Sequence, residues 1–132
     1  MKKSFTLIEL LFSIAIIATI TFVAIPKLIH YLDDAKVLQV KNDLINIKNG
    51  IASYHSKTLL KGENRVLETL EDDQTLFSAI LEYQVDQTIW SKLSNTSYQV
   101  QIKEDSTIFT YDFNNLTFEC NNDDSLCAKI NQ

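Results

Sequence analysis

The N-terminal part of the chain is an apolar run over residues 5–25 that contains a single charged residue, Glu9. The run has 21 residues, and a helix of that length reaches about 31 Å, close to the hydrocarbon thickness of a bilayer. We therefore expect a membrane-spanning helix. An acidic side chain at the centre of a membrane helix costs on the order of 2.5–3.5 kcal/mol, so Glu9 is a candidate functional residue.

A cleavable secretory signal peptide is the competing interpretation, because the run follows the short basic segment 1–4. The run is longer than the roughly 7–15 apolar residues of such a signal, and the cleavage candidate Ala24 has the large Phe22 two positions earlier. We expect the segment to remain in the mature protein. Two lysines precede the run, so the positive-inside rule places the N-terminus in the cytoplasm and everything after Pro26 outside it.

Ser4-Phe5-Thr6-Leu7-Ile8-Glu9-Leu10, with two lysines before it and an apolar helix after it, resembles the N-terminal motif of type IV prepilins and type II secretion pseudopilins. The resemblance implies that a membrane prepilin peptidase cuts between Ser4 and Phe5 and methylates the new amino group of Phe5. Ser4 stands where this family usually has glycine. The resemblance also implies that Glu9 pairs with the amino terminus of a neighbouring subunit during assembly.

The spacing of Phe5 and Glu9 agrees with this pairing. Glu9 lies four residues after Phe5, or about 6 Å along a helix axis. Parallel helices staggered by about one turn would therefore bring the terminal ammonium of one chain near the carboxylate of another. In the isolated subunit, Glu9 lies one turn from the cytoplasmic interface, and its carboxylate is also able to reach water there.

The apolar pattern continues beyond Pro26. Proline in a helix interior removes one hydrogen bond, so we expect a kink there, and Pro26 is a candidate assembly residue together with Glu9. The alternative is a helix that ends at residue 25. Apolar residues at alternating spacings of three and four argue for one continuous helix over residues 5–54. These residues are Val37, Val40, Leu44, Ile47, Ile51 and Tyr54.

The C-terminal part of the sequence has mainly strand patterns. Alternating or β-branched segments predict strands over residues 98–103, 108–113 and 116–120, with Asn114-Asn115 as a two-residue hairpin turn. A short helix is expected over residues 74–84, capped by Asp72 or Asp73. The predicted fold class is α+β and pilin-like: a long N-terminal helix packed on a small antiparallel sheet of about three strands.

This pattern divides the chain into four predicted parts. They are a cytoplasmic leader (1–4) that is removed, a membrane and assembly helix (5–25), an amphipathic continuation of the helix (26–56), and a small α+β head (57–132) with a disulfide-bounded C-terminal loop.

Cys120 and Cys127 enclose six residues. A disulfide that closes so short a loop contributes roughly 2–2.5 kcal/mol on the chain-entropy estimate, and the predicted topology permits oxidation. The alternatives are free thiols or a metal site, but two cysteines do not complete a zinc site. The loop resembles the cysteine-bounded C-terminal region of many type IV pilins, where it serves subunit contacts or surface recognition.

The polar residues inside this loop suggest a second interpretation. Oxygen ligands from Asp123 and Asp124, with the asparagines before them, suit calcium, and some members of the pseudopilin family bind calcium near the C-terminus. Such residues more commonly serve turn geometry. We therefore expect no cofactor, and Asp123 and Asp124 remain weak calcium candidates.

Enzymatic chemistry has little support in the sequence. His30 and His55 lie 25 residues apart on one predicted helix, and the chain has only two glycines and no phosphate-binding loop. Its net charge of -5 disfavours direct binding of nucleic acid. We expect a structural subunit of a type IV pilus, a competence pilus or a type II secretion pseudopilus, which are three alternatives that the sequence does not separate.

The expected location is the bacterial inner membrane, with a single span, a cytoplasmic N-terminus and a periplasmic head. After assembly, the filament would lie in the periplasm or at the cell surface. The expected partners are the prepilin peptidase, other pilin or pseudopilin subunits, the inner-membrane assembly platform and membrane lipid. The alternative function is a singly anchored membrane protein whose head binds a ligand or partner and does not polymerise.

Overall fold

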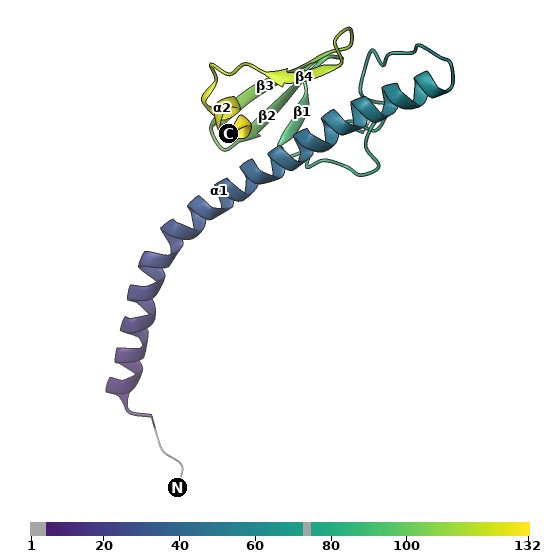
Figure 1. The fold of residues 1–132 in the computed structure, drawn as a ribbon. Helices are drawn as coiled ribbons and strands as arrows, with labels where there is room; N and C mark the ends of the chain where they lie inside the picture. The colour runs from purple at the N-terminus through teal and green to yellow at the C-terminus, as the bar shows by residue number, and fades with distance from the viewer. Residues whose placement is uncertain (1–4, 73–74) are drawn as a thin grey trace. The chain divides into compact units, whose positions relative to one another are not determined.

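The computed structural model describes residues 5–72 and 75–132, without the side chains of Ile29 and His30. The predicted leader, with Ser4, and the cap candidate Asp73 lie outside the described residues. The elements follow in the order α1 (Leu7–Leu60), β1 (Trp90–Lys92), β2 (Ser97–Ile102), β3 (Asp105–Asp112), β4 (Thr117–Cys120) and α2 (Ser125–Asn131) (Figure 1). The chain divides into two compact units, the first up to Ala35 and the second over Lys36–Gln132.

Helix α1 has 54 residues and continues through Pro26, so the alternative of a helix ending at residue 25 is wrong. Its C-terminus lies six residues beyond the predicted end at Tyr54. Gly62 adopts a left-handed φ of 74°, and its amide donates to the carbonyl of Leu59 while the amide of Glu63 donates to the carbonyl of Thr58. These two bonds form a Schellman motif that ends the helix.

The sheet is antiparallel with the order β1-β2-β3-β4, one strand more than predicted. Strand β1 was not predicted because it has only three residues, and its pairing with β2 places Trp90 opposite Val100. The predicted two-residue turn at Asn114-Asn115 is wrong. Asp112 pairs with Thr117, which leaves a four-residue loop, and the positive φ of 55° lies at Leu116.

The predicted helix over residues 74–84 is also wrong. Its described part forms turns and bends, and Phe77 has a left-handed φ of 62°, which no α-helix accommodates. The Phe77 side chain is fully buried, so packing in the core outweighs the local helical pattern. Helix α2, which was not predicted, begins after Asp124, whose side chain accepts a hydrogen bond from the amide of Leu126 at 3.2 Å.

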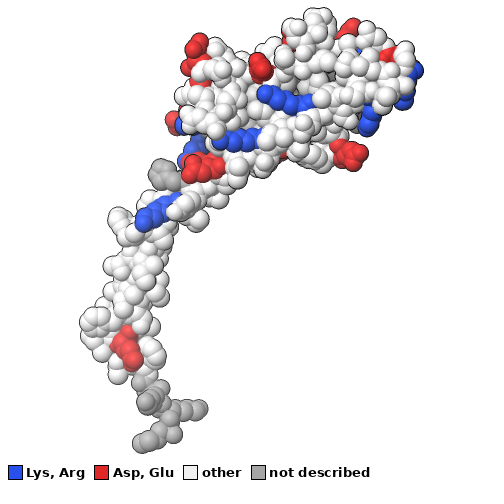
Figure 2. Space-filling view, in the orientation of Figure 1, with Lys and Arg blue, Asp and Glu red and all other residues white. Residues whose placement is uncertain are grey.

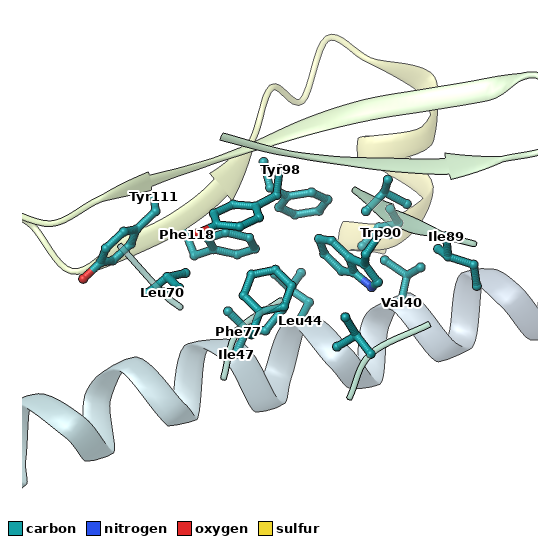
Figure 3. Packing of buried hydrophobic residues seen from close by; sticks show 14 of the residues in the cluster. Val40, Leu44, Ile47, Leu70, Phe77, Ile89, Trp90, Tyr98, Tyr111 and Phe118 are labelled. Carbon is teal, nitrogen blue, oxygen red and sulfur yellow. The ribbon is translucent and has the colours of Figure 1, made fainter. Parts of the chain in front are cut away.

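The core of the second unit lies between α1 and the sheet (Figure 3). The helix contributes Val40, Leu44, Ile47 and Ile51, which are all buried as their spacing predicts. Six buried aromatic residues lie in this core, and five of them contact one another, with neighbouring ring centroids from 4.7 Å (Phe77 and Tyr98) to 6.3 Å (Trp90 and Phe118). Aromatic side chains of this size dominate the burial energy of a small core. The five in mutual contact are Phe77, Trp90, Tyr98, Phe109 and Phe118, and the sixth is Tyr111.

The turn after Phe77 packs on α1 at Gly50. A Cβ atom at this position would lie 2.7 Å from the carbonyl oxygen of Ile80 and 3.0 Å from its Cβ. The backbone of the turn therefore requires glycine at a helix-interior position, although glycine costs about 1 kcal/mol there relative to alanine.

We predict that Gly50→Ala lowers the free energy of unfolding by about 1–3 kcal/mol, because the clash with the Ile80 carbonyl outweighs the gain in helix propensity. Urea denaturation of the full chain in detergent, followed by the fluorescence of the single tryptophan, Trp90, measures the change. Ser53→Ala, an exposed position on the same helix, is the control and should change stability by about 0.5 kcal/mol or less. A Gly50→Ala variant as stable as wild type would contradict the close packing.

Candidate functional site

The first turn of α1 contains Glu9 as its third residue. The Glu9 amide lies 3.4 Å from the hydroxyl oxygen of Thr6 and 3.1 Å from its carbonyl oxygen. Thr6 thus caps the helix, and Thr6-Leu7-Ile8-Glu9 matches the capping-box pattern. A carboxylate in the first turn is also favoured by the helix dipole. The cap formed by Thr6 was not predicted, although the T-x-x-E spacing indicates it.

The apolar residues around Glu9 are uncovered in the first unit. From Phe5 to Ile25, the large apolar side chains are 52% (Ile25) to 83% (Phe22) exposed. Figure 2 shows how few charged side chains this part of the chain carries. Among the described residues, α1 is the one helix long and apolar enough to cross a membrane.

The hydroxyl groups of this segment are satisfied by the helix itself. Ser13 donates to the carbonyl of Glu9, Thr19 to that of Ile16 and Thr21 to that of Ile17, each at 2.8 Å. In a hydrocarbon environment an unsatisfied polar group costs several kcal/mol, so these bonds make the segment compatible with lipid. The Glu9 carboxylate therefore differs in kind from the other polar groups of the run, because it carries a charge.

The predicted processing and assembly residues have different positions. Phe5 is 69% exposed and precedes α1, whereas Pro26 lies inside the helix. Ser4, on the other side of the predicted cleavage bond, lies outside the described residues. The pairing of Glu9 with Phe5 is a contact between two chains and stays a prediction.

Cys120 and Cys127 form a disulfide with a Cα–Cα distance of 5.9 Å. It ties α2 to the end of β4. The polar residues between the cysteines have local partners: the Asp123 amide donates to Asn121 Oδ1 at 3.1 Å, and Asn131 Nδ2 donates to Asn122 Oδ1 at 2.7 Å. Asp124 caps α2, so turn and cap geometry account for this segment.

The described residues form no cluster of metal ligands. Within residues 5–72 and 75–132, no three His, Cys, Asp or Glu side chains gather so that they could hold a metal ion. Calcium binding at Asp123 and Asp124 stays a prediction.

A buried carboxylate in the head was not predicted. Asp43 is 6% exposed, accepts a hydrogen bond from Trp90 Nε1 at 3.1 Å and lies 3.5 Å from the hydroxyl of Tyr83. Asn46 donates to the same hydroxyl at 2.9 Å. Burial raises the pKa of Asp43 above its ordinary value of 3.8, against the two hydrogen bonds, which lower it. Asp43 thus joins α1 to β1 and to the segment before it.

No protein-family model, curated protein or solved structure matches the chain.

We predict that Asp43→Ala lowers the free energy of unfolding by about 1–3 kcal/mol, because it leaves the buried Trp90 N–H without an acceptor. Asp43→Asn keeps an acceptor oxygen and should cost less. Urea denaturation followed by circular dichroism compares both variants with wild type. Equal losses in the two variants would contradict the hydrogen-bonding role.

The raised pKa of Asp43 gives this comparison a pH dependence. The native state holds the Asp43 proton more tightly than the unfolded state, so the contribution of Asp43 to stability is fully present below pH 3.8. It falls as the pH rises through the native pKa. We therefore expect the difference in the free energy of unfolding between wild type and Asp43→Asn to favour wild type most at low pH. If the stability of wild type relative to Asp43→Asn increased with pH, the raised pKa of Asp43 would be contradicted.

Proposed function

We propose that this chain is a structural subunit of a type IV pilus-like filament. In this proposal the chain enters the bacterial inner membrane through α1, is cleaved between Ser4 and Phe5, is methylated on Phe5, and polymerises through its N-terminal helix. The observation that carries the proposal is an uncovered apolar helix with one acidic side chain in its first turn, four residues from the proposed new terminus.

The proposed role of Glu9 follows from its charge. A capping box would need an acceptor at this position but no charge, and glutamine serves a capping box as well as glutamate does. The charge is the costly part in lipid. Cleavage before Phe5 would create an ammonium group, and that group on a neighbouring copy would neutralise Glu9 in the assembled helix bundle.

The disulfide in the head agrees with a location of the head outside the cytoplasm. Its small core is supplemented by a disulfide, which persists in oxidising compartments. Secretion pseudopilus, competence pilus and adhesive or motile pilus all remain versions of this proposal.

A second candidate is a singly anchored membrane protein whose head binds a ligand without polymerising. A cavity of about 340 Å³ in the head favours it. Lys48, Glu119, Asn122 and Asn131 contribute polar groups to its lining, and its volume is at the lower end of the range for ligand pockets. Processing at Ser4-Phe5 separates the two candidates.

We predict that the protein extracted from the membrane of its host lacks its first four residues and carries one added methyl group. Intact-mass measurement tests this directly. A full-length, unmethylated chain would contradict the filament proposal and favour the anchored protein. Ser4→Gly, which restores the usual family residue, is the matched control for the cleavage site and should be processed at least as completely.

We predict that Glu9→Gln and Glu9→Val both abolish filament assembly. Removing one member of a buried, paired charge costs roughly 2–5 kcal/mol, which is more than tenfold at every subunit contact. Filament recovery by shearing and sedimentation measures the effect, and immunoblotting of membranes confirms that each variant is inserted.

Thr6→Ala is the control for capping in this experiment. It removes the cap hydroxyl and keeps the Glu9 charge, so it should reduce recovery far less than Glu9→Gln. Normal assembly of Glu9→Gln would show that Glu9 acts through capping alone and would remove the charge-pairing mechanism.

A further inference from the structure

Strand β4 lies at one end of the sheet, and only one of its edges is paired. The strand order β1-β2-β3-β4 gives β4 a single neighbour, β3 (Figure 1). Helix α2, which follows β4 in the chain, packs on β3. The outer edge of β4 therefore has no neighbouring strand within the part of the chain that the structure describes. An open edge of this kind presents backbone donors and acceptors to a partner.

The strand register identifies the backbone groups at this edge. The amide of Tyr111 in β3 donates to the carbonyl of Thr96 at 2.7 Å, so the backbone of Tyr111 faces the β2 side. Phe118 of β4 lies opposite Tyr111. In an antiparallel pair, opposite residues that do not bond each other direct their backbone groups outwards. Phe118, and Cys120 two residues later, therefore point their N–H and C=O groups to the open edge.

The cavity of about 340 Å³ in the head borders the same edge. Three consecutive residues of β4 line it, namely Phe118, Glu119 and Cys120, so the open edge and the cavity adjoin. Lys48 from α1 and Asn122 from the disulfide loop also contribute polar groups to the lining. A segment bound along β4 would therefore pass beside a partly polar cavity.

Lys48 is the one cation among the described residues that line the cavity. Its ammonium group forms no salt bridge with any residue that the structure describes. The Phe118 side chain is buried on the side of the sheet that faces α1 (Figure 3), and successive side chains of a strand point to opposite faces. The Glu119 side chain therefore points away from α1 and leaves Lys48 without a neutralising charge.

We propose that an extended segment of another protein adds to the open edge of β4 as a fifth strand, with one acidic side chain of that segment beside Lys48. Backbone groups of the segment bond the N–H and C=O groups of Phe118 and Cys120, which is the general mode of strand addition. Every second side chain of the segment faces the cavity. The backbone bonds suit many sequences, so the side chain in the cavity gives the contact its specificity.

The polar groups of the cavity favour a carboxylate at that position. Lys48 supplies the opposite charge. Asn122 supplies a donor, because its Oδ1 accepts from Asn131 Nδ2 at 2.7 Å while its own Nδ2 has no acceptor among the described residues. A lysine or arginine in the bound segment would instead meet Lys48 as a like charge. A free carboxylate without a backbone would leave the edge of β4 unbonded.

The strands of a second copy of the chain do not offer such a segment. Strands β2 and β3 are paired on both edges. At the outer edge of β1, the Trp90 amide already donates to the carbonyl of Asp86 at 2.9 Å. An antiparallel β4–β4 pair would place both Glu119 side chains on the face away from α1, so neither would reach Lys48. The proposed contact also involves neither Phe5 nor Glu9 and is independent of polymerisation.

Amide exchange measured by NMR on the full chain in detergent tests the contact. Isotope-labelled phenylalanine and cysteine report on Phe118 and Cys120. The probe is the synthetic peptide Thr-Val-Glu-Val-Thr, acetylated and amidated so that its ends carry no charge. We expect the peptide at millimolar concentration to slow exchange at these two amides and to leave the amide of Cys127 in α2 unchanged.

Matched probes separate the side-chain contact from the backbone contact. The peptide Thr-Val-Gln-Val-Thr lacks the charge and should bind about fivefold more weakly, the upper range for an exposed ion pair. Lys48→Met should remove this difference. Lys57→Met, exposed on the same helix and outside the cavity, should keep it. The glutamate peptide with every backbone nitrogen methylated lacks all backbone donors and should not bind.

Four results would overturn the proposal. Equal binding of the glutamate and glutamine peptides would remove the role of Lys48. Undiminished binding of the methylated peptide would mean a side-chain contact without an added strand. Protection of Phe118 and Cys120 that grows with protein concentration in the absence of peptide would assign the edge to a second copy. Failure of all peptides to bind at millimolar concentration would remove the edge as a peptide site.

Discussion

The burial of one stripe of α1 under a cluster of six aromatic side chains is the interaction on which the head depends. The stripe brings Gly50 against the turn after Phe77 and places Asp43 where Trp90 and Tyr83 reach it. Each contact restricts the residue on the helix. Residue 50 must have no Cβ atom, and residue 43 must have a hydrogen-bond acceptor. The amphipathic half of α1 is therefore the central part of the core, and the sheet has no other long element to pack on in the described chain.

The parts of the fold that were predictable have local signals. The spacing of Val40, Leu44 and Ile47 specifies a buried helical face, and alternation specifies most of β2, β3 and β4, because these periods are properties of the backbone itself. The missed parts depend on distant contacts. Phe77 takes a left-handed conformation because its ring fills the aromatic core, and β1 is too short to show an alternating pattern. No local pattern distinguishes Asp43 from the exposed polar residues around it.

At the candidate site, the main residue was predicted from the sequence and its local contacts were not. Glu9 was identified from its cost in an apolar run, and its position in the first turn agrees with that argument. Thr6 caps the first turn by accepting from the Glu9 amide, and the T-x-x-E spacing matches the capping-box pattern, in which the Glu9 side chain would accept from the Thr6 amide. The two roles require different properties of Glu9: capping needs an acceptor, and pairing with a neighbouring terminus needs a charge. The open edge of β4 was not predicted, because the order of the strands in a sheet depends on contacts between distant residues.

The continuity of α1 has a mechanical consequence. The same unbroken helix supplies the apolar segment at the N-terminus and the stripe at the centre of the head core. A force pulling along α1 would act on all the contacts of that stripe in shear, and contacts loaded in parallel resist more than contacts peeled one by one. The Cys120–Cys127 disulfide joins β4 to α2 and makes no covalent link to α1. The resistance of the head to this pulling force would therefore come from the packing of its aromatic core on α1.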